Sequence, residues 1–185
     1  FDIVGTLGAG VYSDEGTVTL DGDFDIISVN EEAIDALDLV MDGSFTVTGA
    51  TTAIECNNLT YTGSSLQVSG VTGIHAVESV DLDGDDIRIT SSGARSSGIW
   101  CEGDTTLAGA VFIRTNGWYG VNGEGNVNLN GGCFDIAGPK GDAQVIKVGG
   151  ELYMDESLTF IAPSGTHLRG TDICDATGFP AKEVL

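Results

Sequence analysis

The sequence repeats one phrase of about 21 to 25 residues eight times. Each copy opens with an apolar-x-apolar triplet, in which x is any residue. A small residue followed by an aliphatic one comes later, then a second such triplet and a turn of Gly, Asp, Asn or Ser. The opening triplets begin at Phe1, Phe24, Phe45, Leu66, Ile87, Val111, Phe134 and Leu158. A fixed period of this length is the signature of a solenoid.

The third copy, residues 45–65, shows how one repeat is built. Residues 45–47, 53–56 and 59–61 each alternate apolar and polar side chains, which is typical of a short strand with one buried face. Turns rich in Gly, Thr, Asn and Ser separate them. Strands this short are not stable alone, but stacked copies would form three parallel sheets around a shared interior. The sequence therefore predicts an all-β parallel β-helix of about eight coils, with three short strands per coil.

Residues 30–40 also fit a short helix, because Asn30 can cap it and two glutamates follow in the first turn. We favour a strand here, since Ala33-Ile34 aligns with Ala53-Ile54 in the next copy and Leu39 aligns with Leu59. A leucine-rich repeat has a similar period, but its LxxLxLxxN pattern is missing. The repeats are expected to cover residues 1–168 and to end in an irregular C-terminal cap, residues 169–185.

The charge balance is strongly acidic, with 28 acidic residues, 7 basic residues and a formal net charge of −21. Such a chain lacks the basic surface that binds nucleic acid or an anionic membrane. No run of 18 apolar residues indicates a transmembrane helix, so neither nucleic acid nor membrane insertion is expected.

None of the four cysteines forms a CxxC pair of the kind that binds zinc. Cys56 and Cys101 take the same place in their copies, two coils apart with Ala76 between them. Coils stacked ~4.8 Å apart would separate the two by roughly 10 Å, which exceeds the ~7 Å limit for the Cα atoms of a disulfide. We expect free thiols that pack as small apolar residues.

The repeat grammar resembles that of the single-stranded right-handed β-helix family, often called pectin-lyase-like, across about residues 1–168. It is most similar to repetitive bacterial secreted and cell-surface members described as carbohydrate-binding-like or adhesin-like. The resemblance implies a right-handed solenoid, a bacterial extracellular or cell-surface location, and a polysaccharide or a host or cell-surface glycan as partner.

The enzyme motifs of that family are not matched. Its galacturonan hydrolases carry Asn-Thr-Asp, paired Asp, Gly-His-Gly and Arg-Ile-Lys in that order. Here Asp85-Asp86 forms a pair, but the nearest histidine phrase, residues 73–75, precedes it, and residues 88–90 lack the lysine. The lyases of this fold use Ca²⁺ held by aspartates with an arginine or lysine as base. Arg88, whose expected neighbours are Gln67 and Phe112, does not fit that role.

Outward side chains of equivalent strands should form rows down the stack. The middle-strand row carries the most chemistry and is expected to read Tyr12, Asp35, Glu55, His75, Trp100, Asn122 and Ile146. Neighbouring carboxylates raise one another's pKa, and a histidine beside them could move a proton or bind a metal. Exposed aromatic rings beside carboxylates are what sugar-binding surfaces use. The candidate binding residues are Tyr12, Asp35, Glu55, His75, Trp100 and the turn pair Trp118 and Tyr119. The alternative is that they are ordinary surface residues with no binding role.

The turns that close each coil hold a second acidic row, expected at residues 21–23, 42–43, 83–86, 104 and 155–156. Stacked carboxylates could hold Ca²⁺, but Asp and Gly are also ordinary turn residues, and no EF-hand or GGxGxD phrase occurs. No other cofactor and no metal site is expected.

The most consistent function is an extracellular or cell-surface scaffold for glycan or surface recognition, adhesin-like and without a recognisable catalytic motif. The alternatives are a polysaccharide lyase or glycoside hydrolase with a non-standard site, and a purely structural stalk. Because the chain starts at Phe1 and its first triplet is already a repeat, we interpret it as a trimmed segment with flanking modules in a longer surface protein.

Overall fold

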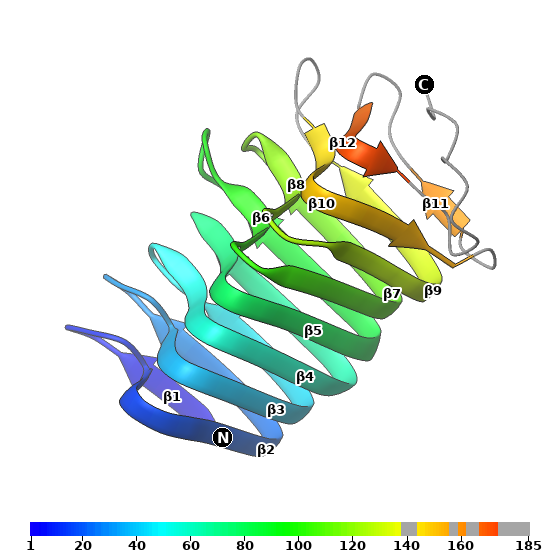
Figure 1. Cartoon of the computed structure of the whole chain (residues 1–185). Helices are drawn as coiled ribbons and strands as arrows, with labels where there is room; N and C mark the ends of the chain where they lie inside the picture. The colour runs from blue at the N-terminus through cyan, green and yellow to red at the C-terminus, as the bar shows by residue number, and fades with distance from the viewer. Residues whose placement is uncertain (138–143, 156–158, 162–166, 174–185) are drawn as a thin grey trace.

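The chain forms a parallel β-solenoid of about seven turns, close to the eight predicted (Figure 1). The computed structural model describes residues 1–137, 144–155, 159–161 and 167–173. Within these residues there is no helix, and therefore none long and apolar enough to cross a membrane. The strands are β1 (Asp2–Gly5), β2 (Val11–Ser28), β3 (Ile34–Thr48), β4 (Thr52–Gly70), β5 (Thr72–Ser91), β6 (Ser97–Cys101), β7 (Asp104–Thr115), β8 (Tyr119–Gly123), β9 (Val127–Ala137), β10 (Gln144–Met154), β11 (Thr159–Ile161) and β12 (His167–Ile173).

Every strand pairs in parallel with the equivalent strand of the next coil, so equivalent residues of the repeat lie side by side. Ile34 pairs with Ile54, and Leu39 pairs with Leu59. These pairs confirm that residues 34–40 are strand rather than helix, because a strand in register satisfies each backbone group on both neighbouring coils.

The predicted alignment fails at the last copy. Phe134 of β9 pairs with Phe160 of β11, whereas the sequence pattern aligned it with Leu158. The shift is two residues, and a shift of two leaves the same alternate residues on each face of a strand. The apolar triplet alone therefore could not distinguish the two alignments.

The strands are longer than the predicted three to five residues. β3, β4 and β5 contain 15, 19 and 20 residues and bend around the corners of the coil without a break. Side-chain alternation marked only the straight segments, while hydrogen bonds to the neighbouring coils continue through the corners. Later coils are divided: β5 pairs with both β6 and β7.

The core is one continuous column of apolar side chains inside the coils. Each row repeats one position of the phrase, as in the middle-strand row of Ile34, Ile54, Ile74, Ile99, Val121 and Ile146, all fully buried. Burying each such side chain contributes about 1.5–3 kcal/mol. Because every row is shared between neighbours, no single coil has a core of its own.

Cys56, Ala76 and Cys101 occupy one inward row in successive coils, as predicted. Both thiols are buried and free. Burial is the largest cause that raises the pKa of Cys56 to about 12 and the pKa of Cys101 above its ordinary value. Both cysteines therefore act as packing groups, and the Cys101 thiol also donates a hydrogen bond to the Asp104 carbonyl oxygen at 3.4 Å. Cys174 lies outside the described residues.

The predicted C-terminal cap falls mostly outside the described residues, since 174–185 are among those left out. Strand β12 runs into its first part, and Lys147 and Val148 of β10 pair with Arg169 and Gly170. The parallel stacking therefore continues to residue 173.

One corner of the coil is built from stacked glycines. Gly22, Gly43 and Gly63 pair in successive coils. Gly43 has a φ of 126°, and a Cβ atom there would overlap the carbonyl oxygen of Gly22. Tyr61 closes the inner side of this corner by donating a hydrogen bond to the carbonyl oxygen of Gly43 at 3.2 Å. The Asp-Gly phrase of the repeat is thus required by coil-to-coil contact as well as by turn conformation.

We predict that Gly43→Ala lowers the free energy of unfolding by about 3 kcal/mol or more, because the methyl group has no room beside the neighbouring backbone. Gly16→Ala is the matched control, since Gly16 also has a positive φ of 70° but nothing within 4 Å of the position that a methyl group would take. Its cost should be near 1 kcal/mol, the strain of the conformation alone. Urea denaturation followed by circular dichroism measures both; equal costs would contradict close stacking at this corner.

Candidate functional site

The outward row of the middle strand is continuous over seven coils. Strand pairing joins, in order, Tyr12, Asp35, Glu55, His75, Trp100, Asn122 and Lys147. We call this series the outer row. Six of its members were predicted, and the seventh is a correction: Lys147 takes the place assigned to Ile146. Ile146 pairs with Val121 and is fully buried, because a shift of one residue exchanges the inward and outward faces.

A groove of about 290 Å³ lies over the early part of the outer row. Tyr12, Asp35 and Glu55 line it, so the structure brings three predicted residues to one depression. The tyrosine is 65% exposed and forms one end. The remaining lining residues are Ser13, Asp14, Ala36, Leu37, Cys56, Asn57 and Val77.

The groove combines acidic and apolar groups. Leu37 and Val77 are exposed at 37% and 43%, whereas Asp35 and Glu55 are partly buried. Burial, and secondly the charge of Glu32, raises the pKa of Asp35 above its ordinary value. Glu32 is itself fixed by a hydrogen bond that the Thr51 hydroxyl donates to it at 2.7 Å. A surface of this kind offers hydrogen-bond acceptors beside apolar contact area.

His75 continues the outer row beyond the groove and is surrounded on three sides. Its ring stacks on Trp100, with centroids 4.4 Å apart and planes 27° from parallel. Nδ1 lies 3.6 Å from Glu55 Oε1, and Nε2 lies 3.7 Å from Glu102 Oε1. Nε2 is buried and has no hydrogen-bond partner among the described residues. The stack fixes the indole of Trp100 beside the His75 ring while leaving 37% of the Trp100 residue exposed.

Trp118 and Tyr119 do not belong to the outer row but flank its later coils. Tyr119 begins β8 and pairs with Ser97 and Gln144. The two rings meet edge to face at 6.4 Å and 81°, and 52% of Trp118 is exposed. The structure therefore separates the predicted aromatic residues into Tyr12 at one end and the Trp100, Trp118 and Tyr119 group several coils away.

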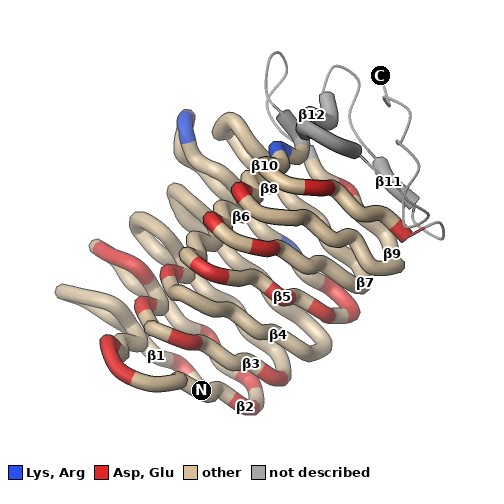
Figure 2. Tube along the Cα trace, viewed as in Figure 1, with Lys and Arg blue, Asp and Glu red and all other residues tan. Residues whose placement is uncertain are grey.

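Basic residues are scarce and, among the described residues, lie toward the later coils, whereas acidic residues occur along most coils (Figure 2). Arg88 lies between Gln67 and Phe112, as predicted. It also forms an ion pair at 2.9 Å with Asp86, a neighbour in its own strand that the row pattern did not predict. Its guanidinium lies 4.7 Å from the Phe112 ring centroid. Arg88 is thus engaged on the first-strand face, away from the outer row.

The acidic turns do not form an unbroken row of carboxylates. Asp21 and Asp42 are neighbours, but Thr62 follows them before Asp83. The prediction for Asp104 is wrong, because it pairs with Ser79 at a different corner. In the part of the chain that the structure describes, no three His, Cys, Asp or Glu side chains gather closely enough to hold a metal ion.

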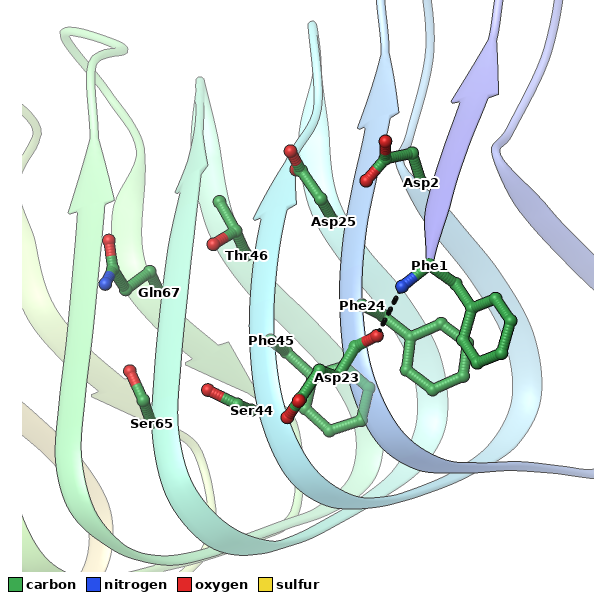
Figure 3. Close-up of a pocket in the computed structure, with 10 residues that line it drawn as sticks. All are labelled: Phe1, Asp2, Asp23, Phe24, Asp25, Ser44, Phe45, Thr46, Ser65 and Gln67. Atoms are coloured by element: carbon green, nitrogen blue, oxygen red, sulfur yellow. Dashed lines mark hydrogen bonds between the residues drawn. The ribbon is translucent and has the colours of Figure 1, made fainter.

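A second depression, also of about 290 Å³, lies at the first coils and was not predicted (Figure 3). Its inner wall is a stack of phenylalanines in which Phe1 and Phe24, and Phe24 and Phe45, have ring centroids 5.4 Å apart. The Phe1 nitrogen donates a hydrogen bond to the Asp23 carbonyl oxygen at 2.6 Å. The phenylalanines repeat one core position of the phrase, so this depression follows from core packing. It contains none of the predicted site residues.

One further row, which was not predicted, lies beside the outer row. Leu37, Asn57, Val77 and Glu102 each follow the last inward residue of the middle strand. Three of them line the groove, and the fourth contacts His75. The sequence could have predicted this row. Cys56 and Cys101 take the same place in their copies of the repeat, so the residues that follow them lie at the same corner of the coil.

Comparisons of the chain with protein-family models, with curated proteins and with solved structures gave no match. The parallel β-solenoid is therefore established by the structure itself, and the resemblance to the pectin-lyase-like family stays a prediction.

The raised pKa of Asp35 predicts a pH-dependent effect of Asp35→Asn. The folded state binds this proton more tightly than the unfolded state, so the ionised carboxylate destabilises the fold at neutral pH. Asp35→Asn should raise the free energy of unfolding at pH 7, and the gain should fade as the pH drops through the folded pKa toward the ordinary value of 3.8. Urea denaturation across this pH range measures it. A gain that does not change with pH would contradict the assignment.

Proposed function

We propose that the chain is a β-solenoid binding module that recognises glycans or a glycan-bearing surface through its outer row. The observation that carries the proposal is the groove over Tyr12, Asp35 and Glu55, continued along the same row by the Trp100 ring. A bacterial extracellular or cell-surface location, which the family resemblance implies, fits this role.

The chemistry of the groove suits sugar rings. Carboxylate oxygens of Asp35 and Glu55 can accept hydrogen bonds from sugar hydroxyls, while the Tyr12 ring and Leu37 provide apolar area for the C–H face of a ring. Ligand sites generally combine a few convergent polar groups with apolar walls in this way. The groove lies on rigid, doubly paired strands, so little ordering is needed when a ligand binds.

The length of the row favours an extended ligand. Tyr12 and Trp100 are separated by four coil-to-coil steps of ~4.8 Å, which places them roughly 19 Å apart. A single sugar unit could not contact both. The two aromatic residues would therefore hold different units of one oligosaccharide, with Glu55 and His75 between them.

We predict that Tyr12→Ala and Trp100→Ala each weaken glycan binding about 3- to 10-fold, the loss expected for one aromatic contact. A glycan array identifies the tightest neutral oligosaccharide, and titration calorimetry then measures the affinities. Tyr153→Ala is the matched control, because Tyr153 is also exposed, at 36%, but lies in a row of another strand, paired with Asn128. The proposal fails if the wild-type chain retains no glycan, or if the control loses as much affinity as the two variants.

A glycoside hydrolase at the same groove is the second candidate, because the pKa of Asp35 is raised and Glu55 is its neighbour in the row. Paired carboxylates with different pKa values are what general acid and base catalysis of glycoside cleavage requires. In that case Asp35→Asn should reduce the release of new reducing ends about 10²- to 10⁴-fold. A reducing-sugar assay on the bound polysaccharide tests this. Equal release of reducing ends by the wild-type protein and by Asp35→Asn would exclude Asp35 as the general acid.

A further inference from the structure

The later part of the outer row carries two cations, whereas the groove carries carboxylates. It consists of Trp100, Asn122 and Lys147 from the row, with Arg95, Trp118 and Tyr119 beside them; we call it the basic-aromatic patch. Trp100 pairs with Asn122, and Asn122 pairs with Lys147. The loop that holds Arg95 is tied to the next loop by a hydrogen bond from the Trp118 amide to the Ser96 carbonyl oxygen at 3.0 Å. In Figure 1 these loops project along one edge of the solenoid, before β6 and β8.

The two cations of the patch differ from the other described basic side chains. Arg88 and Arg114 form ion pairs with Asp86 and Asp135. Among the described residues, no carboxylate lies within ion-pair distance of Arg95 or Lys147, in a chain with 28 acidic residues. Their charges are therefore free to meet an anion from outside.

Each of these cations lies over an aromatic ring. The Arg95 guanidinium is 5.6 Å from the Trp118 ring centroid, and the Lys147 ammonium is 5.4 Å from the Tyr119 ring centroid. The two rings contact each other edge to face. Contact with the rings restricts where the two charges can point, so the patch presents positive charge beside exposed aromatic faces.

Asn122, between Trp100 and Lys147 in the row, is largely buried. Only 8% of this residue is exposed, yet its side-chain oxygen has no hydrogen-bond partner among the described residues. An unpaired buried polar atom has a substantial free-energy cost. This oxygen is covered by neighbouring atoms, so Asn122 belongs to the patch without offering a contact to a ligand.

From these contacts we infer that the basic-aromatic patch binds the anionic unit of a glycan, a sugar ring that carries a carboxylate or a sulfate. The anion pairs with Lys147 and Arg95, and the ring stacks on the exposed indole of Trp118. The inference builds on the proposed glycan-binding function and specifies which sugars the later coils select. The net charge of −21 repels a polyanion from the chain as a whole, so binding depends on the local positive charge of Lys147 and Arg95.

The test uses three hexasaccharides: N-acetylchitohexaose, which is neutral; unsulfated chondroitin, which carries carboxylates; and chondroitin sulfate, which carries both groups. Titration calorimetry of the whole chain should show tighter binding of a charged hexamer than of the neutral one. The affinity for the charged hexamer should also fall as salt is added. Equal binding of both chondroitins would identify the carboxylate as the recognised group, and preference for the sulfated one would identify the sulfate.

Lys147→Gln and Arg95→Gln should each weaken binding of the charged hexamer about tenfold, since each removes one charge-assisted contact. Trp118→Ala should weaken binding of the charged hexamer by a similar factor. Lys147→Gln and Arg95→Gln should leave binding of the neutral hexamer unchanged. Arg88→Gln is the matched control, because Arg88 also lies over an aromatic ring but already pairs with Asp86. It should leave both affinities unchanged.

The outcomes separate this inference from the proposed function. If no charged hexamer binds, or if Lys147→Gln and Arg95→Gln have no more effect than Arg88→Gln, the inference is wrong, even where Tyr12→Ala weakens binding of a neutral glycan. If the charged hexamer binds through Lys147 and Arg95 while Tyr12→Ala changes nothing, the patch stands and the proposed role of the groove fails.

Discussion

Backbone hydrogen bonding between coils is the constraint on which the rest of this structure depends. Each strand of the middle coils donates and accepts on both sides, which holds equivalent positions of the repeat about 4.8 Å apart. The same register that stacks Ile54 on Ile74 inside stacks Glu55 on His75 outside. The core and the candidate site are thus two faces of one ladder, and neither can shift without the other.

The corner glycines show how tightly the register limits the sequence. The backbones of successive coils approach so closely there that a methyl group on Gly43 would overlap the carbonyl oxygen of Gly22. Outward positions have no such limit. In the outer row a tyrosine, two carboxylates, a histidine, an indole, an amide and an ammonium follow one another on nearly the same backbone. Stability depends on the inward and corner positions, so the outward positions are free to vary in chemistry.

The repeat predicted the fold class, the inward rows, the free thiols and six of the seven residues of the outer row. It failed where periodicity carries no information. The apolar pattern is unchanged by the two-residue shift that pairs Phe160 with Phe134. The extra residues of the last coils obscured the one-residue difference between Ile146 and Lys147. The groove and the contact of Glu102 with His75 depend on side-chain directions at corners, which alternation does not specify. The burial of the Asn122 oxygen depends on local packing, which alternation does not specify either.

The order of charges along the outer row has a consequence for any long molecule that lies on it. Asp35 and Glu55 occupy early coils, and Lys147 lies several coils later. The row therefore has a direction, from acceptors to a cation, that is fixed by the direction of the chain itself. A polymer with distinct ends would match this sequence of surroundings in only one of its two orientations, so the surface distinguishes the head of such a polymer from its tail.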